Sequence, residues 1–511
     1  MGHVHLSRRE ILRSIPVLTA GAALVCPRGQ ASGGKAIVRG ALRDAATGKP
    51  CAAKIRVSAD GAYYLPEHAV QTMPRSKEPF FYANGSYEIA IPTGRFDIEV
   101  ARGISHQGVT AHVEVGPGVT RTLDFDIPVL RDLHASGWYS GNTHTHYHLE
   151  LEENPDDRLR LVPPAEGLDI SVISYLLRGD SKYITNQYPI GRLPQFSGGG
   201  TLIDMGEEAR NNRTDWDMGY GHSLFLNIPR LVEPVSTGLL VAGGKAPDFP
   251  TLSMLCEEAK KIGGTTIWCH NGRGMEMPVA VARRAIDAFN LGDGSDAEYA
   301  RYYNLLACGF RLPASTGTDW WIYDHNRVFV QVEGGFSYES WLAGLRAGRT
   351  FVTNGPLLDL QVNGKGPGAS LDTEGPLRLR ARAVSRVPFE RLEIVCDGEI
   401  VADQPAVEGR EVIMEREIPV SRSGWIGARV AGKTRTYAGF TVFAHTSPIY
   451  FRVANTPARR AQAAGAFIDE IEEAVRYIRR KYRFTSEADR AVAIGRFEEA
   501  RQFYANLAAQ G

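Results

Sequence analysis

The chain lacks an excess of charge of either sign, since its 511 residues include 58 Lys and Arg against 58 Asp and Glu. With this balance, the net charge gives no indication that the protein binds nucleic acid or an acidic membrane surface. A cysteine framework is also lacking, because the six cysteines are scattered and form no Cys-x-x-Cys pair. We expect most of them, including Cys269, to be small core residues.

The N-terminal apolar stretch, Ile15 to Val25, is too short to span a bilayer as a permanent helix. It follows the paired arginines Arg8 and Arg9 and precedes the small-x-small site Gly29-Gln-Ala31. Residues 1–34 are therefore predicted to be a twin-arginine-type signal peptide. We expect a periplasmic or secreted protein without a stable membrane anchor.

The 54 glycines and 28 prolines indicate many turns, and the length suggests three or four structural units. Apolar and polar residues alternate over 35–130, which resembles a transthyretin-like or carboxypeptidase-regulatory-like β-sandwich. Residues 131–365 alternate short apolar strands with helical stretches, as in an α/β barrel or layered sheet. Residues 366–455 return to alternation and predict an immunoglobulin-like sandwich, and residues 456–511 have helical spacing.

Several local elements can be predicted inside these units. Strands are expected at 138–143, 168–174, 221–228, 264–270 and 312–319, and helices at 251–262, 278–291 and 337–348. In the later sandwich Arg378, Arg380 and Arg382 would line one face of a strand. That row is either a basic binding strip or a solvated face opposed by acidic side chains.

His144 and His146 stand two residues apart at the end of an expected strand, so both imidazoles project from one face. Such a pair can bind one divalent metal ion. His270 and Asp319 also end their strands, and barrel enzymes assemble their sites at that rim. A further acid, Glu207 or Glu208, is expected from a loop at 204–210, just before Gly221-His222 opens a strand.

In this order, and followed by Gly348-Arg-Thr-Phe-Val-Thr-Asn-Gly-Pro356, these motifs resemble the PHP (polymerase and histidinol phosphatase) superfamily. Within it they look most like the exported carbaryl-esterase-like (CehA/McbA-type) metallohydrolases. The likeness covers roughly residues 135 to 365. It implies a distorted (β/α) barrel, flanked here by β-sandwich domains and a C-terminal helical segment.

The resemblance implies that His144, His146, Glu208 and Asp319 bind one metal ion. A second ion would share Glu208 and add His222 and His270. Two motifs depart from the trinuclear pattern: Ser174-Tyr-Leu-Leu-Arg178 stands where many members have Thr-Asp-His, and Asp319-Trp-Trp321 stands where they have Asp-x-His. We therefore expect at most two ions, which can be zinc, manganese or iron.

A two-metal site of this kind hydrolyses bonds with a metal-activated water. We expect an ester, carbamate or amide substrate, either a small molecule or a saccharide ester. A phosphoester substrate, or a non-catalytic binding module that kept the fold, are the alternatives. His222, His270, Arg178 and Arg273 are the expected catalytic residues. Arg178, Lys182 and Arg273 could bind an anionic group of the substrate, and the alternative is that they are ordinary surface charges.

Overall fold

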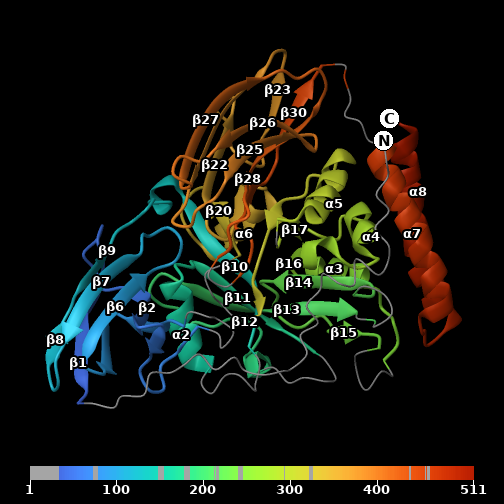
Figure 1. Ribbon diagram of the computed structural model, residues 1–511. Helices are drawn as coiled ribbons and strands as arrows, with labels where there is room; N and C mark the ends of the chain where they lie inside the picture. The colour runs from blue at the N-terminus through green and yellow to red at the C-terminus, as the bar shows by residue number, and fades with distance from the viewer. Residues whose placement is uncertain are drawn as a thin grey trace.

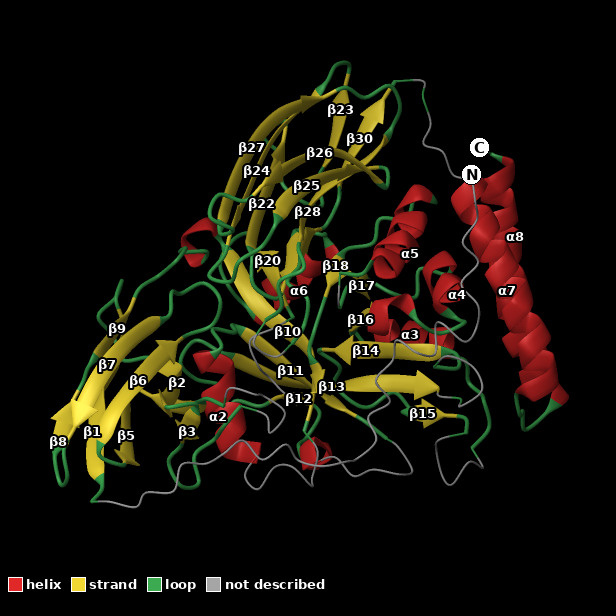
Figure 2. Cartoon of the chain, viewed as in Figure 1, coloured by secondary structure: helices red, strands yellow, loops and turns green. Residues whose placement is uncertain are grey.

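The computed structural model describes residues 34–72, 79–147, 155–177, 184–211, 213, 218–239, 246–292, 294–320, 326–436, 439–454, 456 and 461–510. Residues 1–33 of the expected signal peptide, together with Arg178 and Lys182, lie outside this set. Figures 1 and 2 show a strand-rich α/β chain with several sheets and a helical C-terminus. The expectation of a mixed α/β and β chain is confirmed at this level.

Two sheets packed face to face form the N-terminal part, drawn in blue in Figure 1. One sheet contains β1 (Ala36–Asp44), β5 (Ser86–Ile91), β8 (Thr120–Thr122) and β9 (Phe125–Ile127). The other contains β2 (Ala52–Ala59), β3 (Ala62–Tyr64), β4 (Phe81–Asn84), β6 (Gly94–Ala101) and β7 (Val109–Val115). Their alternating apolar side chains, such as Val38, Ile55 and Ile98, meet in a shared core.

A curled sheet forms the central part of the chain (Figure 2). Its longer strands are β10 (Trp138–His146), β11 (Ile170–Tyr175), β13 (Leu202–Asn211), β14 (Gly221–Leu226), β16 (Thr265–Trp268), β20 (Arg327–Gln331) and β21 (Thr350–Thr353). Short strands complete it: β12 (Gly191–Arg192), β15 (Ser236–Thr237), β17 (Ala288–Asn290), β18 (Ala314–Ser315) and β19 (Asp319–Trp320). The strands β10, β11 and β13 are parallel neighbours, so their carboxyl ends share one edge.

Helices pack around this sheet and bury its outer side chains. They are α2 (Pro155–Ala165), α3 (Leu252–Lys261), α4 (Met277–Ala282), α5 (Asp296–Ala307) and α6 (Tyr338–Arg346), with the 3-10 turns η1 (His134–Ser136), η2 (Ile184–Gln187) and η4 (His270–Gly272). Ser295 and Ser337 cap α5 and α6 by accepting backbone N–H bonds. Cys269 is fully buried in this core, as expected.

Three predictions for the central part are wrong. The expected loop at 204–210 is the fully buried middle of β13, whose charged residues face the protein interior instead of solvent. The expected helix at 278–291 stops at Ala282, and Arg284 then adopts a φ of 56°, which ends the helix before the buried strand β17. Within 312–319 only Ala314–Ser315 and the start of β19 at Asp319 are strand.

The C-terminal sandwich continues directly from the central sheet, because β21 pairs with β29. One layer is the three-stranded sheet of β22 (Leu357–Val362), β24 (Leu377–Val384) and β27 (Glu411–Ile418). The other layer contains β23 (Ser370–Thr373), β25 (Arg391–Cys396), β26 (Glu399–Pro405), β28 (Gly424–Ala431), β29 (Ala444–Thr446) and β30 (Ile449–Val453).

The Thr-Asn-Gly-Pro segment forms the turn that joins these two parts. Asn354 donates a side-chain hydrogen bond to the carbonyl of Thr441 at 2.6 Å, and its Oδ1 accepts one from the N–H of Phe443 at 2.9 Å. The hydroxyl of Thr353 donates to the carbonyl of Pro356 at 2.6 Å. This motif therefore fixes the sandwich to the sheet.

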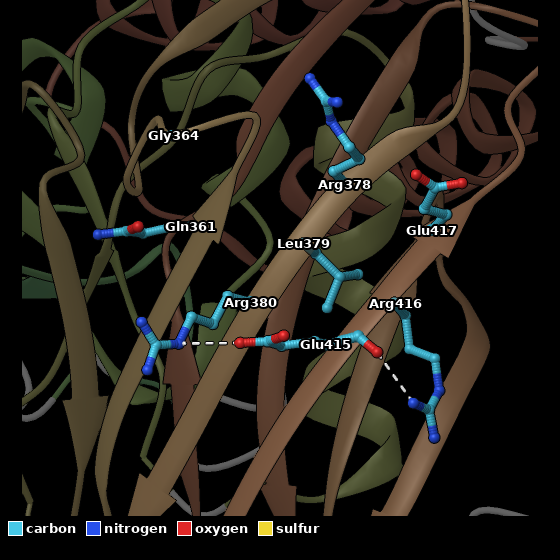
Figure 3. Close-up of a pocket in the computed structure, with 8 residues that line it drawn as sticks. All are labelled: Gln361, Gly364, Arg378, Leu379, Arg380, Glu415, Arg416 and Glu417. Carbon is cyan, nitrogen blue, oxygen red and sulfur yellow. Dashed lines mark hydrogen bonds and ion pairs between the residues drawn. The ribbon is translucent and has the colours of Figure 1, made fainter.

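Figure 3 shows the outer face of β24 and β27 with two members of the arginine row, Arg378 and Arg380. Arg380 lies 3.4 Å from Glu415, Arg382 lies 2.9 Å from Glu411, and Arg378 stands opposite Glu417 across the ladder. Each arginine thus faces an acidic neighbour. The pairing favours the solvated charged face over the basic binding strip.

Two long antiparallel helices end the chain, α7 (Ala461–Lys481) and α8 (Glu487–Ala509), drawn in red in Figure 1. The sequence repeats Phe467, Ile471, Val475 and Ile478 at helical spacing, which predicts a packed helix, and Val492, Phe497 and Phe503 suggest a second one. The first four and Phe497 are buried. Val492 and Phe503 are exposed instead, because α8 packs through Ala493, Phe497, Ala500 and Tyr504. Among the described residues, no helix combines the length and the apolar character needed to cross a membrane.

Candidate metal centre

Two histidines at the carboxyl end of β10 begin the site. His144 and His146 lie on the same face of the strand, and their Nε2 atoms are 3.0 Å apart. The short strand β19 runs parallel to β10 and pairs Asp319 with Thr145, the residue between the two histidines. The Oδ1 atom of Asp319 therefore lies 3.3 Å from Nε2 of His144 and 3.6 Å from Nε2 of His146.

The acid between the histidines is Glu208. Consecutive residues of a strand face opposite sides, so β13 directs Glu207 and Glu208 in different directions. The Oε2 atom of Glu208 lies 2.9 Å from Nε2 of His146 and 3.6 Å from Nε2 of His144. Glu207 instead accepts a hydrogen bond from the N–H of Val232 at 2.7 Å. Of the two acids, the structure brings Glu208 and not Glu207 to the other candidate ligands.

The second oxygen of Glu208 faces two further histidines. Its Oε1 atom lies 2.7 Å from Nδ1 of His222, which opens the antiparallel strand β14, and 3.4 Å from Nε2 of His270. His270 follows β16 and lies 3.9 Å from Oδ2 of Asp319 through its Nδ1. One carboxylate thus contacts all four imidazoles.

These distances fit metal coordination. Donor atoms about 2.1 Å from a common ion lie roughly 3.0 to 3.4 Å apart in tetrahedral or octahedral arrangements. In the first group, the distance between the Nε2 atoms of His144 and His146, and the distances from them to the carboxylates of Glu208 and Asp319, are 2.9 to 3.6 Å. The second group, Glu208, His222 and His270, brings its donor atoms within 4.8 Å of one another. Each group could bind a metal ion.

Neighbouring groups orient the candidate ligands. The Nδ1–H of His146 donates to the carbonyl of Ser174 at 2.9 Å, which leaves its Nε2 lone pair directed into the site. Asn142 accepts hydrogen bonds from the backbone N–H groups of His144 and Thr318, both at 3.2 Å, and so ties β10 to the segment that ends in Asp319. Sequence reasoning did not identify this role of Asn142.

Two candidate ligands have an unusual backbone conformation. The φ angles of His270 and Asp319 are 49° and 64°, in the left-handed region that side chains other than glycine seldom adopt. Gly317 is equally constrained, because a Cβ atom there would lie 2.6 Å from Cβ of His144. Backbone strain of this kind is typical of binding sites whose surroundings hold the residue in place.

Burial sets the protonation of the site. It lowers the pKa of His144 and, with the nearby charge of Arg210, brings the pKa of His222 well below its ordinary value. Burial alone would raise the pKa of Glu208, but Arg210 and the surrounding imidazoles bring it well below the usual range. Neutral imidazoles and an ionised carboxylate are the forms that ligate metals.

Of the three basic residues expected to bind an anion, Arg273 is the one that the structure describes. Arg273, three residues after His270, is half-buried, and its backbone carbonyl accepts a hydrogen bond from the indole of Trp268 at 2.9 Å. Arg178 and Lys182 are outside the described residues. The arginine that does reach the site is Arg210, whose Nη1 lies 3.8 Å from Oε2 of Glu208. The only sequence signal for it was its position two residues after Glu208.

No family model matches the chain, and no curated protein matches it. Solved structures with a weak likeness include a beta-glucuronidase from Bacteroides uniformis, 10% identical over 80% of this chain and 58% of that chain, with a TM-score of 0.20. A glycosyl hydrolase family 2 member from Bacteroides cellulosilyticus is 11% identical over 78% and 59% of the two chains, with a TM-score of 0.19. This chain spans less than two thirds of either protein. Likenesses at these TM-scores carry no argument about fold or function.

Proposed function

We propose that this chain is a divalent-metal-dependent hydrolase that cleaves an ester, carbamate or amide bond. The observation that carries the proposal is the convergence of six ligand-type side chains from five separate segments around the carboxylate of Glu208. The two groups share that carboxylate, which suits a site for two ions. Ions of zinc, manganese or iron all suit a mixed imidazole and carboxylate set.

A divalent cation in such a site supplies a nucleophilic water at neutral pH and polarises the bond to be cleaved. The chain's own residues prepare the site for this chemistry. His144 and His146 present two imidazole Nε2 atoms from one strand face, and Glu208 provides a carboxylate oxygen to each group. The side chains of His270 and Asp319 are 19% and 31% exposed, whereas Glu208 is 2% exposed. Substrate would therefore enter from the side of His270 and Asp319.

The same geometry supports membership of the PHP superfamily, in its carbaryl-esterase-like branch. The parallel strands β10, β11 and β13 carry or adjoin candidate ligands near their carboxyl ends, as the rim of a distorted (β/α) barrel would. The twin-arginine-type N-terminus supports export to the periplasm or beyond. A small molecule or a saccharide ester would be the substrate, and no nucleic acid is expected as a partner.

Two alternatives use the same residues. Phosphoester hydrolysis needs only the two groups and a cation for the anionic substrate, and the buried Arg210 beside Glu208 favours it as the second candidate. A non-catalytic metal-binding module is the other alternative, and the departures at Ser174-Tyr-Leu-Leu-Arg178 and Asp319-Trp-Trp321 support it.

Metal analysis of the purified protein tests the proposal first. We expect at least one tightly bound equivalent of a divalent metal, and less than one equivalent would reject the hydrolase. His270→Ala should lower the metal content and abolish turnover of an activated ester that the parent protein hydrolyses. His112→Ala is the matched control, because that imidazole is 81% exposed on β7. An unchanged rate in His270→Ala would refute the assignment of the site.

A further inference from the structure

Arg210 occupies a particular place beside the candidate metal centre. It follows Glu208 by two residues on β13, so both side chains lie on the same face of the strand. Two residues of a strand span about 6.6 Å. Since β13 runs parallel to β10 and β11, Arg210 lies one side-chain layer beyond Glu208, toward the edge where the parallel strands end.

The guanidinium of Arg210 makes no hydrogen bond to a described residue, and its nitrogens keep some contact with solvent although the residue is mostly buried. Arg210 is 7% exposed, and its side chain has one ion-pair contact with a described residue, the 3.8 Å approach of Nη1 to Oε2 of Glu208. That oxygen already faces His146 at 2.9 Å and His144 at 3.6 Å. Arg210 and Glu208 therefore form an ion pair at 3.8 Å without a hydrogen bond between them.

Another buried arginine of the chain is bonded directly. Arg496 donates to the hydroxyl of Ser253 at 2.8 and 3.0 Å and to Glu257 at 2.8 Å. Arg210 lacks such partners, so its N–H donors are free to bind an acceptor on a ligand, and a mostly buried charge gains from that partner. A planar guanidinium matches the two oxygens of a carboxylate or a phosphoryl group.

The net charge of the site also favours an anionic ligand. Glu208 and Asp319 together cancel one divalent cation if the histidines are neutral. Arg210 then remains as an uncompensated positive charge beside the site, and any second cation adds to it. Such a site attracts a substrate with a negative charge near the bond to be cleaved.

We propose that Arg210 binds an oxyanion group of the substrate and thereby selects anionic substrates. This inference rests on the proposed hydrolase, and it adds the substrate class: an ester, amide or phosphoester with a carboxylate or phosphoryl group beside the scissile bond. Arg210 is then the specificity residue of the site, and Glu208 holds its guanidinium in place through the 3.8 Å contact.

The test compares two activated esters of similar size, the anionic 4-nitrophenyl hydrogen succinate and the neutral 4-nitrophenyl butyrate. Arg210→Gln should lower the ratio of kcat/KM for the anionic ester to kcat/KM for the neutral ester at least tenfold, chiefly by raising KM for the anionic ester. Arg210→Lys, which keeps the charge but loses the fork, should recover part of the selectivity. Arg230→Gln is the control, because that arginine is 57% exposed and pairs with Glu258.

A binding measurement makes the test independent of turnover. Calorimetric titration of the metal-loaded protein with inorganic phosphate and with succinate should show that Arg210→Gln weakens binding of at least one of them tenfold or more, at unchanged metal content. The anion that loses more affinity identifies phosphoryl or carboxylate as the recognised group. The Arg230→Gln control should bind both as the parent does.

Other results would overturn the inference. Equal losses for both esters with unchanged anion affinity would make Arg210 a structural partner of Glu208. Tighter metal binding in Arg210→Gln with unchanged selectivity would mean that the arginine only neutralises Glu208. A parent protein that binds no metal would refute the proposed hydrolase instead. The phosphate and succinate titrations, carried out on the metal-free protein, would then still test whether Arg210 binds an anion.

Discussion

Glu207→Gln should stabilise the protein, and the gain should grow with pH. Glu207 is 0% exposed, and burial raises its pKa to about 8 from an ordinary value of 4.5. The N–H of Val232 donates to Oε2 at 2.7 Å, while Oε1 has no hydrogen-bond partner among the described residues. Glutamine has nearly the same shape, keeps an acceptor for Val232 and never ionises.

The sign follows from proton linkage. Above about pH 4.5 the unfolded chain releases the proton of Glu207, whereas the folded chain retains it until about pH 8. Folding of the parent therefore becomes less favourable as pH rises through this window, and levels off above it. One pKa unit corresponds to about 1.4 kcal/mol, so the cost is roughly 1 kcal/mol at pH 5 and roughly 3 kcal/mol at pH 7.

The assay is thermal unfolding of Glu207→Gln and of the parent protein at several pH values between 5 and 7.5. Between pH 5 and 7 the difference in Tm should widen by roughly 4 to 8 °C, for a cooperative unit of 150–250 residues. Titration of the metal ligands affects both proteins and cancels in the difference. Glu333→Gln, at a side chain that is 76% exposed, is the control and should show no such widening. A constant difference in Tm across the range would refute the buried, protonated Glu207.

Two further substitutions test the packing around the site and between the sheets. Gly317→Ala should lower metal affinity 10- to 100-fold in a competition assay with a chelator. The added Cβ would lie 2.6 Å from Cβ and 2.7 Å from the backbone nitrogen of His144, so this ligand must shift. The control Gly355→Ala, whose Cβ meets nothing closer than 3.7 Å, should bind metal like the parent. Lys54→Met should cost about 1.5–3 kcal/mol in urea unfolding, because it removes the 3.0 Å charged partner of the fully buried Glu166. Glu166, which joins the N-terminal sheets to the central part, keeps the Tyr82 hydroxyl at 2.9 Å and Arg327 at 3.7 Å. The double variant Lys54→Met/Glu166→Gln should recover part of that loss, and a double variant as unstable as the single one would contradict the role of the ion pair.

The alternating and helical patterns could be predicted because one face of those elements meets a core. The strands β5 and β6 alternate between exposed and buried residues, and α7 buries the predicted stripe around Ile471. The fully buried elements were harder to predict. In β13 and β17 both faces are inside, so the period of two that marks a half-exposed strand is lost. The polar residues of β13 consequently read as a loop.

The six candidate side chains could be selected from the sequence, because their motifs follow one another along the chain in the order that the family resemblance implies. The resemblance favoured Glu208, but only the strand assignment of 202–211 shows that Glu207 and Glu208 face opposite sides. Arg210 could not be recognised at all. A charged residue near an acid in sequence is usually solvated, and only the tertiary structure shows that this one is buried.

The strained backbone of His270 and Asp319 links the fold to the proposed chemistry. Both residues pay for a left-handed conformation that glycine or asparagine would adopt more easily, and each such residue costs of order 1–3 kcal/mol. Neither glycine nor asparagine offers an imidazole or carboxylate donor at that position. The same two side chains are the most exposed of the six, at 19% and 31%, so they form the open side of the site. His144 and His146, by contrast, lie on β10 without a left-handed φ and are nearly fully buried. Strain is thus concentrated in the exposed ligands, which must meet a substrate, while the buried ligands hold the ion.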